Sequence, residues 1–395
     1  MENTRRKTKR RSNKSKEDSK RKKAKVGGTA NQYLPYDVLR IIFKHLNGMD
    51  LSNASVVCRT WLKAATDEKR IRGPVYFVDV YDELCLSTKP PVKPCCFRKQ
   101  VIKDLQIKPA FGIFLQSEWQ HEEEDCHAEI LPPNCYTVTL NTFGVVLNDK
   151  EYEKHPADEY AYGSTAWAFL PEMPGVTIKT FVLPFPTTSV NTLSPKHFDS
   201  FTNNLKEALG KPKVADDKSR CLLVFSRRYN ASIGKILRSV KRRYPDGPVS
   251  VWGGIVGGIV VHSRDCLDID FLCTQSAYCV GVVITGSLQT WSIIVDKSHE
   301  TEEQVERKLT VLKNRVRLKR HSMGFMFACY GRGYWKYGEH DVEASIFKKL
   351  FPEVPLIGCF GNGEFGTNTI VDESASKRAP LYNEMSTVFL VLTYD

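Results

Sequence analysis

Residues 34–46 of the chain read Leu-Pro-Tyr-Asp-Val-Leu-Arg-Ile-Ile-Phe-Lys-His-Leu, and residues 57–61 read Val-Cys-Arg-Thr-Trp. Pro35 suits the first turn of a helix, because its φ angle is fixed and its missing N–H would have no partner there. The apolar residues that follow recur at helical spacing on one face: Leu39, Ile42, Phe43 and Leu46. The pattern therefore predicts a helix that ends at Gly48.

Two more short helical stripes are predicted beyond Gly48, from residues Leu51, Ala54, Val57, Cys58 and Trp61. Three helices within about forty residues are too few to bury a core of their own. Because many apolar groups then stay exposed, we expect a partner to cover them. The alternative interpretation is an ordinary three-helix subdomain folded against the rest of the chain.

This segment resembles an F-box, a family marked by a Leu-Pro pair, an acidic residue, an Ile-Phe-like pair and a later Val-Cys-Arg-x-Trp. Asp37 stands where Glu is common in the family. The resemblance implies docking onto the small adaptor of SCF-type ubiquitin ligases and, through it, onto a cullin scaffold and a RING subunit. The adaptor-binding residues that it implies are Leu34, Pro35, Leu39, Ile42, Phe43, Leu46, Leu51, Val57, Cys58 and Trp61.

The positive charge of the chain is concentrated in its first residues. Residues 1–28 hold thirteen Lys and Arg against three acidic residues, so the other 367 residues carry only about +2 of the formal +12. With almost no apolar residues, residues 1–30 are predicted to be a disordered tail. A nearly neutral folded body argues against specific binding of nucleic acid.

Two basic clusters in the tail predict a bipartite nuclear localisation signal read by an import receptor. The alternatives are non-specific contact with phosphates and a merely solubilising tail. We therefore expect the protein in the nucleus and the cytoplasm. The import residues are Arg5, Arg6, Lys7, Arg10, Arg11, Lys20, Arg21, Lys22 and Lys23.

Other classes of protein are not indicated. No apolar stretch follows the basic start, and the run Val249 to Val261 is interrupted by four glycines, so neither a secretory signal nor a membrane span is expected. The twelve cysteines include no CxxC pair, and without an export signal a reducing compartment is expected, so we expect free thiols rather than disulfides. Their spacing matches no zinc pattern, and neither metal nor cofactor is predicted. The cysteines and histidine weighed for zinc are Cys95, Cys96, Cys126, His127 and Cys135.

Beyond residue 105 strand-like and helix-like segments alternate, which predicts an α+β protein: a small all-α unit followed by a mixed α/β module. Predicted strands are Val75 to Tyr81, Phe111 to Leu115, Tyr136 to Leu147, Thr165 to Leu170, Val176 to Leu183, Cys221 to Phe225, Val280 to Ile284, Trp291 to Val295, Met323 to Cys329 and Thr387 to Thr393. Predicted helices start at the caps Ser194, Ser232 and Thr301, and a last one carries Ala344, Phe347 and Phe351. The second has a basic outer face, read as solvated or as a docking surface for an acidic partner.

Three glycine-bearing turns follow strands, at residues 141–144, 252–258 and 358–366, and their similarity suggests a repeated unit. None has the spacing of a nucleotide-binding loop. The segments 329–333, Cys-Tyr-Gly-Arg-Gly, and 361–364, Gly-Asn-Gly-Glu, resemble motifs of the FIST C-terminal domain. Residues from about 105 to 255 are more weakly similar to the FIST N-terminal domain. The predicted organisation is therefore 1–30 tail, 31–72 F-box, 73–255 FIST N-terminal region and 256–395 FIST C-terminal region.

In this context the FIST resemblance implies recruitment of protein substrates, among them regulators of transcription and chromatin. The recognition candidates are Cys329, Tyr330, Gly331, Arg332, Gly333, Asn362, Gly363 and Glu364. A structural ion pair of Arg332 with Glu364, and a buried, inert Cys329, are the alternatives. No nucleophile constellation stands out, so a non-catalytic receptor is expected. A small-molecule sensor that uses the F-box as a tether is the alternative function.

Overall fold

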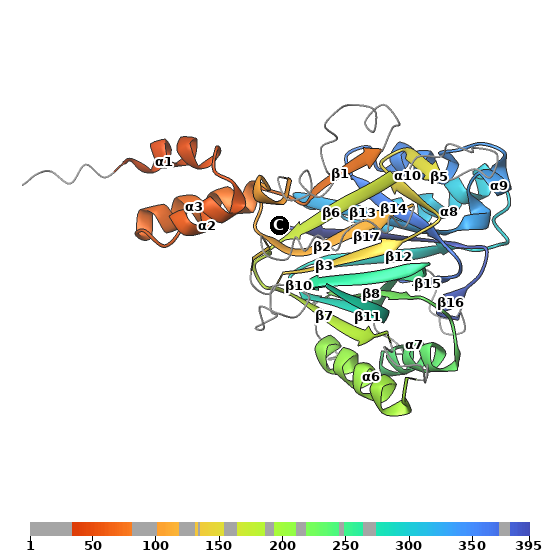
Figure 1. The fold of residues 1–395 in the computed structure, drawn as a ribbon. Coiled ribbons are helices and arrows are strands. Elements are labelled where there is room, and N and C mark those ends of the chain that lie inside the picture. The colour runs from red at the N-terminus through yellow and green to blue at the C-terminus, as the bar shows by residue number, and fades with distance from the viewer. Residues whose placement is uncertain are drawn as a thin grey trace, which may run out of the picture.

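The computed structural model describes residues 34–80, 101–117, 131–132, 135–153, 164–185, 193–210, 219–244, 249–263, 274–370 and 380–395. A small unit of three helices comes first, and a β-rich body follows it (Figure 1). The three helices are α1 (Tyr36–Phe43), α2 (Gly48–Ala54) and α3 (Arg59–Ile71). This arrangement confirms the predicted α+β class.

Several predictions concern residues outside the described ranges and stay predictions. They are the basic tail with its import clusters, together with His127 and three of the cysteines weighed for zinc, Cys95, Cys96 and Cys126. Among the described residues, no helix is both long and apolar enough to cross a membrane.

The larger sheet of the body contains eleven strands within the described chain, ordered β1-β6-β2-β3-β10-β11-β8-β9-β15-β16 with β7 beside β11. The pairs β2/β3 and β8/β9 are parallel, and the others are antiparallel. The strands are β1 (Val75–Val80), β2 (Pro109–Gln116), β3 (Tyr136–Asn141), β6 (Ser164–Pro171), β7 (Val176–Pro184), β8 (Ser219–Ser226), β9 (Val249–Ile255), β10 (Gly258–Ser263), β11 (Thr274–Gly286), β15 (Glu364–Gly366) and β16 (Tyr382–Asn383).

The second sheet has six strands in the described chain, ordered β12-β17-β13-β14-β4-β5. They are β4 (Gly144–Leu147), β5 (Lys150–Glu153), β12 (Gln289–Val295), β13 (His321–Cys329), β14 (Leu356–Gly361) and β17 (Thr387–Tyr394). Strands β4 and β5 come from the first half of the body but complete a sheet of the second half. The predicted division after residue 255 therefore falls between β9 and β10. Both strands belong to one sheet, so the division does not separate two bodies.

The two sheets pack face to face, with helices on both outer sides. Side chains such as Phe225 of β8 and Phe327 of β13 meet in the layer between the sheets. Outward-facing side chains of the larger sheet pack on α6 (Pro195–Leu209) and α7 (Ala231–Arg243). Those of the second sheet pack on α8 (Glu302–Arg315) and α10 (Val342–Leu350). Between β13 and α10 lie the short helices η2 (Tyr330–Arg332) and α9 (Tyr334–Tyr337).

The predicted single strand Tyr136 to Leu147 is two strands, and they lie in different sheets. The change of sheet occurs at Thr142 and Phe143. The N–H of Thr142 donates to the carbonyl of Gln116 in the larger sheet, and the N–H of Phe143 donates to that of Phe360 in the second. Periodicity alone could not show this crossing, because the carbonyls that accept from Thr142 and Phe143 belong to residues distant in the chain.

Helix ends agree with the sequence in part. Thr301 and Gln304 form the predicted capping box of α8. Gly48 does not end the first helix as predicted. It opens α2, because the side chain of Asn47 accepts a hydrogen bond from the N–H of Asp50 at 2.8 Å. For α7 the cap is likewise Asn230, whose Oδ1 accepts from Ile233 N at 3.0 Å, and not Ser232.

Candidate functional site

The F-box unit has a core of its own, contrary to the prediction that it is too small to bury one. Leu39 and Phe43 of α1 are fully buried together with Leu51 of α2. Trp61 of α3 packs edge-on against Phe43, with 5.3 Å between ring centroids. The assignment of Leu39, Phe43 and Leu51 to adaptor contacts is therefore corrected, because these side chains hold the three helices together. Leu46 and Cys58, from the same predicted set, are half-buried.

A different set of apolar side chains of this unit is exposed. Leu34, Val38, Ile41 and Ile42 follow one another at helical spacing, and we call them the α1 face; Ile41 is 61% exposed. Val56 and Val57, in the turn between α2 and α3, are exposed by 83% and 60%. Of these, only Leu34, Ile42 and Val57 were predicted. The spacing of Val38 and Ile41 could have indicated this exposed face, since they lie three residues apart on the side of the helix away from Leu39.

Arg72 connects the F-box unit to the body. Its Nη2 donates to the carbonyl of Phe43 at 2.7 Å, and its Nη1 donates to those of Leu46 at 2.8 Å and Gln106 at 2.5 Å. Its Nε bonds the buried carboxylate of Glu68 at 3.1 Å. One side chain thus joins both ends of the helical unit to the start of the body. A backbone bond from Gly48 N to Leu105 O at 2.8 Å closes the same junction.

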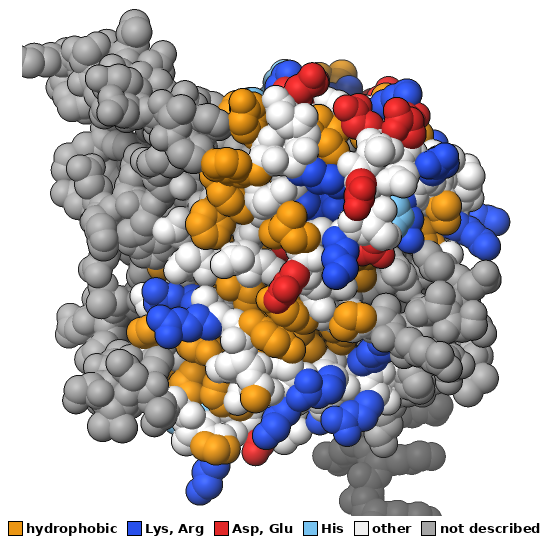
Figure 2. Space-filling view, turned by 90° about the vertical axis from the view of Figure 1, so that its right-hand side faces the viewer, with side chains coloured by type: hydrophobic (Ala, Val, Ile, Leu, Met, Phe, Trp, Pro, Cys, Tyr) orange, Lys and Arg blue, Asp and Glu red, His pale blue; other side chains and the backbone are white. Residues whose placement is uncertain are grey.

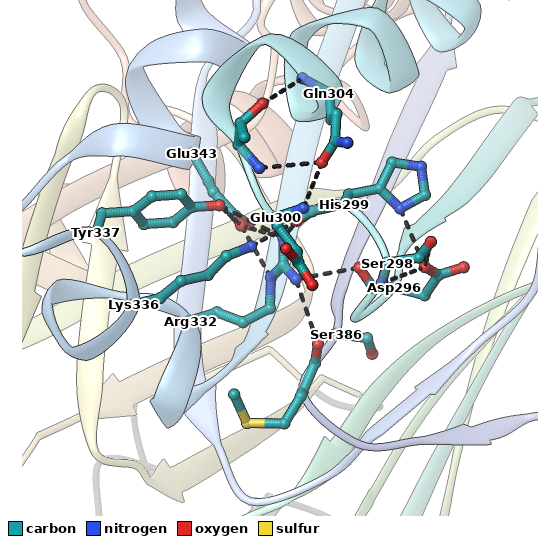
Figure 3. Close-up of polar contacts among 12 residues, drawn as sticks. Asp296, Ser298, His299, Glu300, Gln304, Arg332, Lys336, Tyr337, Glu343 and Ser386 are labelled. Atoms are coloured by element: carbon teal, nitrogen blue, oxygen red, sulfur yellow. Dashed lines mark hydrogen bonds and ion pairs between the residues drawn. The ribbon is translucent and has the colours of Figure 1, made fainter.

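The Gly-Arg-Gly motif of the body is a buried ionic cluster (Figure 3). Arg332 is 2% exposed, and its Nε and Nη2 donate to Oε1 of Glu343 at 2.9 and 2.6 Å. Its Nη1 donates to the carbonyls of Asp296 and Met385 at 3.2 and 3.3 Å. The expected partner Glu364 is therefore wrong, and the guanidinium of Arg332 cannot reach a substrate in this structure. The position of α10, which presents Glu343, determines the pair.

Tyr337 and Lys336 complete the cluster (Figure 3). The Tyr337 hydroxyl donates to Oε1 of Glu343 at 2.7 Å, and burial raises the pKa of this phenol well above its usual range. The ammonium of Lys336 donates to the carbonyl of His299 at 2.6 Å. Burial and, secondarily, the charge of Arg332 lower the pKa of Lys336 to about 8. Arg332, Lys336 and Tyr337 thus donate their hydrogen bonds to Glu343 and to backbone carbonyls.

Glu364, from the second predicted motif, is fully buried beside Ser386. Its Oε2 accepts from the N–H and hydroxyl of Ser386 at 3.0 and 2.7 Å, and its Oε1 accepts from Gly363 N at 3.1 Å. Burial raises the pKa of this carboxyl to about 7, because desolvation outweighs these hydrogen bonds. Cys329 lies beside it, and burial first of all raises the pKa of its thiol. Both residues are therefore corrected from surface candidates to interior ones.

The three glycine-bearing turns meet at one end of the sheets. Gly257 N donates to Asn141 O at 2.8 Å, and Asn362 N donates to Ile255 O at 3.0 Å. Ile255 N donates in turn to Gly363 O at 2.8 Å. Asn362 is the one exposed member of the predicted recognition set; Tyr330 and Gly331 are half-buried, and Gly333 and Gly363 are buried. The turns thus form a connected backbone platform, and they hold this end of the sandwich together.

Exposed apolar side chains surround that platform. The Tyr330 ring lies 5.2 Å from Phe143 and 6.5 Å from Trp335, centroid to centroid. Met385 covers Gly331, where any side chain would collide with its sulfur. Phe143, Trp335 and Met385 are all exposed, Trp335 by 57%. These residues gave no signal in the sequence, because they come from separate segments that only the fold assembles.

A shallow depression of about 360 Å³ lies beside the first turns of α8. It is lined by Ser298, His299, Gln304, Arg307, Lys308 and Val311. Within the described ranges, no three side chains of His, Cys, Asp or Glu gather as a metal site would require.

Residues 32–72 match the model of the F-box domain, so the chain carries an F-box. F-box only protein 22 of Homo sapiens is 28% identical over 366 residues, which cover 85% of each chain. The protein of the same name from Pongo abelii has the same identity and coverage. An F-box/LRR-repeat protein of Arabidopsis thaliana is 24% identical over 192 residues, 48% of this chain and 35% of the relative.

Proposed function

We propose that this chain is the substrate-recognition subunit of an SCF-type cullin-RING ubiquitin ligase. The observation that carries the proposal is the α1 face, an exposed apolar surface on a unit that matches the F-box model. Surfaces of this kind on a folded domain mark protein contacts. The small adaptor of the ligase would cover the α1 face and the Val56-Val57 turn, while Leu39, Phe43 and Leu51 hold the helices beneath.

The body, in this proposal a FIST module, recruits protein substrates for ubiquitination and proteasomal degradation. Its role is non-catalytic: it raises the effective concentration of substrate lysines near the conjugating enzyme, while other subunits perform the thioester chemistry. The Arg72 junction supports this role, because a fixed angle between F-box and body places a bound substrate in a defined direction. The comparison with F-box only protein 22 covers F-box and body together.

We also assign the basic tail to import, so that the protein acts in the nucleus as well as the cytoplasm on substrates that include regulators of transcription and chromatin. The small-molecule alternative has less support. The guanidinium of Arg332 and the hydroxyl of Tyr337 are already bonded to Glu343 in the interior of the protein and do not face a ligand site.

Co-purification of the intact chain with adaptor and cullin tests the proposal. Wild type should form a stoichiometric complex, and Ile41→Glu combined with Val57→Glu should lose it, because two charges would be buried in an apolar contact. Both side chains are exposed, so the variant should fold. Leu34→Ala with Pro35→Ala should weaken the complex less.

Val311→Glu is the matched control, since Val311 is an exposed apolar residue of the body, 41% accessible. It should bind the adaptor like wild type. Loss of the complex in this control would indicate a general defect. A wild-type chain that does not bind, or an Ile41→Glu/Val57→Glu variant that binds normally, would refute the proposal.

A further inference from the structure

A row of cations lies on the exposed side of α7. Lys235, Arg238 and Arg242 are exposed and lie on one face of the helix, and we call them the basic stripe. The stripe is about 10 Å long, seven residues at the helical rise. The opposite face, with Ile233, Ile236 and Leu237 among others, packs into the body. Hydrophobic contacts thus fix the helix, and the basic stripe is held toward solvent.

The basic stripe is not neutralised within the described chain. None of the ion pairs formed among the described residues includes Lys235, Arg238 or Arg242. The neighbouring Arg243 differs, because its Nε donates to the carbonyl of Gly210 at 3.0 Å. Three like charges along two turns repel one another, and an anionic partner would relieve that repulsion.

An aromatic pair adjoins the basic stripe at the start of α7. Tyr229 stacks on Tyr382 of β16 with ring centroids 3.9 Å apart and planes 7° from parallel. A Cβ at Gly234 would lie 2.9 Å from the Tyr229 hydroxyl and 3.1 Å from Nη1 of Arg238. The Tyr229 hydroxyl and the Arg238 guanidinium thus both lie close over Gly234, a helix position without a side chain. Glycine inside a helix costs about 1 kcal/mol relative to alanine, and here it leaves room for both groups.

A second group of apolar side chains begins at Met385, three residues beyond Tyr382 in the chain, and includes Trp335 of α9. Along one segment Tyr382 is followed by Met385, which covers Gly331 next to Tyr330. Phe143 and Trp335 adjoin Tyr330. We call Tyr229, Tyr382, Met385, Trp335 and Phe143 the apolar band. Figure 2 shows the side of the molecule that is on the right in Figure 1; hydrophobic side chains run from its upper left into its middle, and Lys and Arg side chains lie among and around them, several below the middle.

We infer that the basic stripe and the apolar band together bind an acidic segment of a partner polypeptide. Asp and Glu side chains of the segment lie over Lys235, Arg238 and Arg242, and a large apolar residue packs on the band. Charge complementarity gives direction and register, and aromatic contacts give affinity. The inference rests on the proposed function only in calling this partner a substrate.

The surface favours a polypeptide over a nucleic acid. Glu384 is exposed and accepts a hydrogen bond from the Tyr382 hydroxyl at 2.9 Å, so a carboxylate lies within the apolar band. It would repel a continuous phosphate backbone, whereas a peptide can place an uncharged residue there. The basic stripe is also short, and phosphate-driven binding needs many cations along the strand.

Selection of random peptides displayed on phage against the intact chain tests the inference. Peptides that also bind the variant Arg238→Glu/Arg242→Glu are removed from the pool. Peptides that survive should be rich in Asp and Glu next to an aromatic or long aliphatic residue. A synthetic fluorescent copy of a selected peptide should bind wild type in a salt-sensitive manner, and the charge-reversed variant about tenfold or more weakly.

The matched control is Arg315→Glu/Arg317→Glu, two exposed arginines at the end of α8 and just beyond it, with the same change in charge. It should bind the peptide like wild type. Equal loss in the control, a selected pool without acidic enrichment, or tighter binding of a single-stranded oligonucleotide at the same surface would overturn the inference. Co-purification with the adaptor should be unchanged in both variants, so failure here and failure of the proposed function are separate results.

Discussion

At the scale of single residues, the buried pair of Arg332 and Glu343 governs the Gly-Arg-Gly motif. Both side chains are 1% exposed, and Oε2 of Glu343 has no hydrogen-bond partner within the described chain. Removing the guanidinium leaves a buried carboxylate without a counter-charge. The pair therefore matters for stability first, and for recognition only through the surface it supports.

Arg332→Met is expected to lower the free energy of unfolding by about 3–5 kcal/mol. Urea denaturation of the purified chain measures it. The control is Lys349→Met, which breaks the exposed pair with Glu306 and should cost at most about 1 kcal/mol. Similar decreases in the free energy of unfolding of the two variants would show that removing Arg332 does not leave a buried carboxylate without a counter-charge.

Glu364 makes stability depend on pH, since its pKa is raised from 4.5 to about 7 by burial. The folded state then holds its proton more tightly than the unfolded state. The contribution of Glu364 to the free energy of unfolding is therefore fully present below about pH 4.5. It is lost as the pH rises toward 7, by up to roughly 3 kcal/mol.

Urea unfolding at several pH values, compared between wild type and Glu364→Gln, isolates that contribution. The difference between the two proteins should move in favour of the variant as pH rises from 5 to 8, because glutamine cannot ionise. A difference that is constant over this range would rule out the raised pKa.

How far the site could be predicted is clearest at Arg332. An arginine held in a structural ion pair was one interpretation of the Gly-Arg-Gly turn, and the structure confirms an ion pair. The partner could not be named, because Glu343 reaches the guanidinium only through the packing of α10 on the second sheet. Burial of Cys329 was likewise weighed as an alternative, whereas exposed Trp335 and Met385 had no local signal.

At the scale of elements, the glycine-rich strand β9 makes one of the closest backbone approaches among the described residues. Gly253 has φ of +138°, and a Cβ there would lie 2.0 Å from the carbonyl oxygen of Val224 on β8. Neither strand can move aside, since β8 and β9 pair along their length in the interior of the sheet. The glycine is needed both for its backbone angle and for this approach.

Gly253→Ala is expected to destabilise the protein by about 3–5 kcal/mol or to prevent folding. Gly338→Ala is the control, because Gly338 is left-handed with φ of +70° and has open space around it. It should cost about 1 kcal/mol. Thermal unfolding of both variants separates the cost of the close approach to Val224 from the cost of the positive φ angle. Equal melting temperatures would show that the close approach adds no cost.

Element type was predicted better than element partnership. Most predicted strands are strands, with ends shifted by a few residues, because apolar runs bounded by turn residues report local structure. The break between β3 and β4 and the transfer of β4 to the second sheet were missed. Both features depend on hydrogen bonds from Thr142 to Gln116 and from Phe143 to Phe360, whose acceptors are distant in the chain.

At the scale of the whole molecule, the F-box unit extends from one end of the sandwich, whereas β16 and α9, which carry Tyr382 and Trp335 of the apolar band, lie toward the other end (Figure 1). In the proposed receptor these two surfaces must keep a fixed relation for substrate lysines to reach the conjugating enzyme. Arg72 bonds carbonyls on both sides of the junction between them.

Arg72→Ala should therefore loosen the junction without removing the adaptor surface. Hydrogen exchange at the Gly48 N–H, which donates to Leu105 O, should become faster by about tenfold, because the junction opens more often. The expected adaptor affinity is close to wild type, while ubiquitination of a bound partner should slow. Arg70→Ala is the control: its side chain is 57% exposed and, among the described residues, forms a 3.9 Å pair with Asp67. If exchange at Gly48 is unchanged in Arg72→Ala, or rises equally in Arg70→Ala, the junction is held by the backbone bond and apolar contacts, and a rigid path from F-box to substrate cannot be assigned to Arg72.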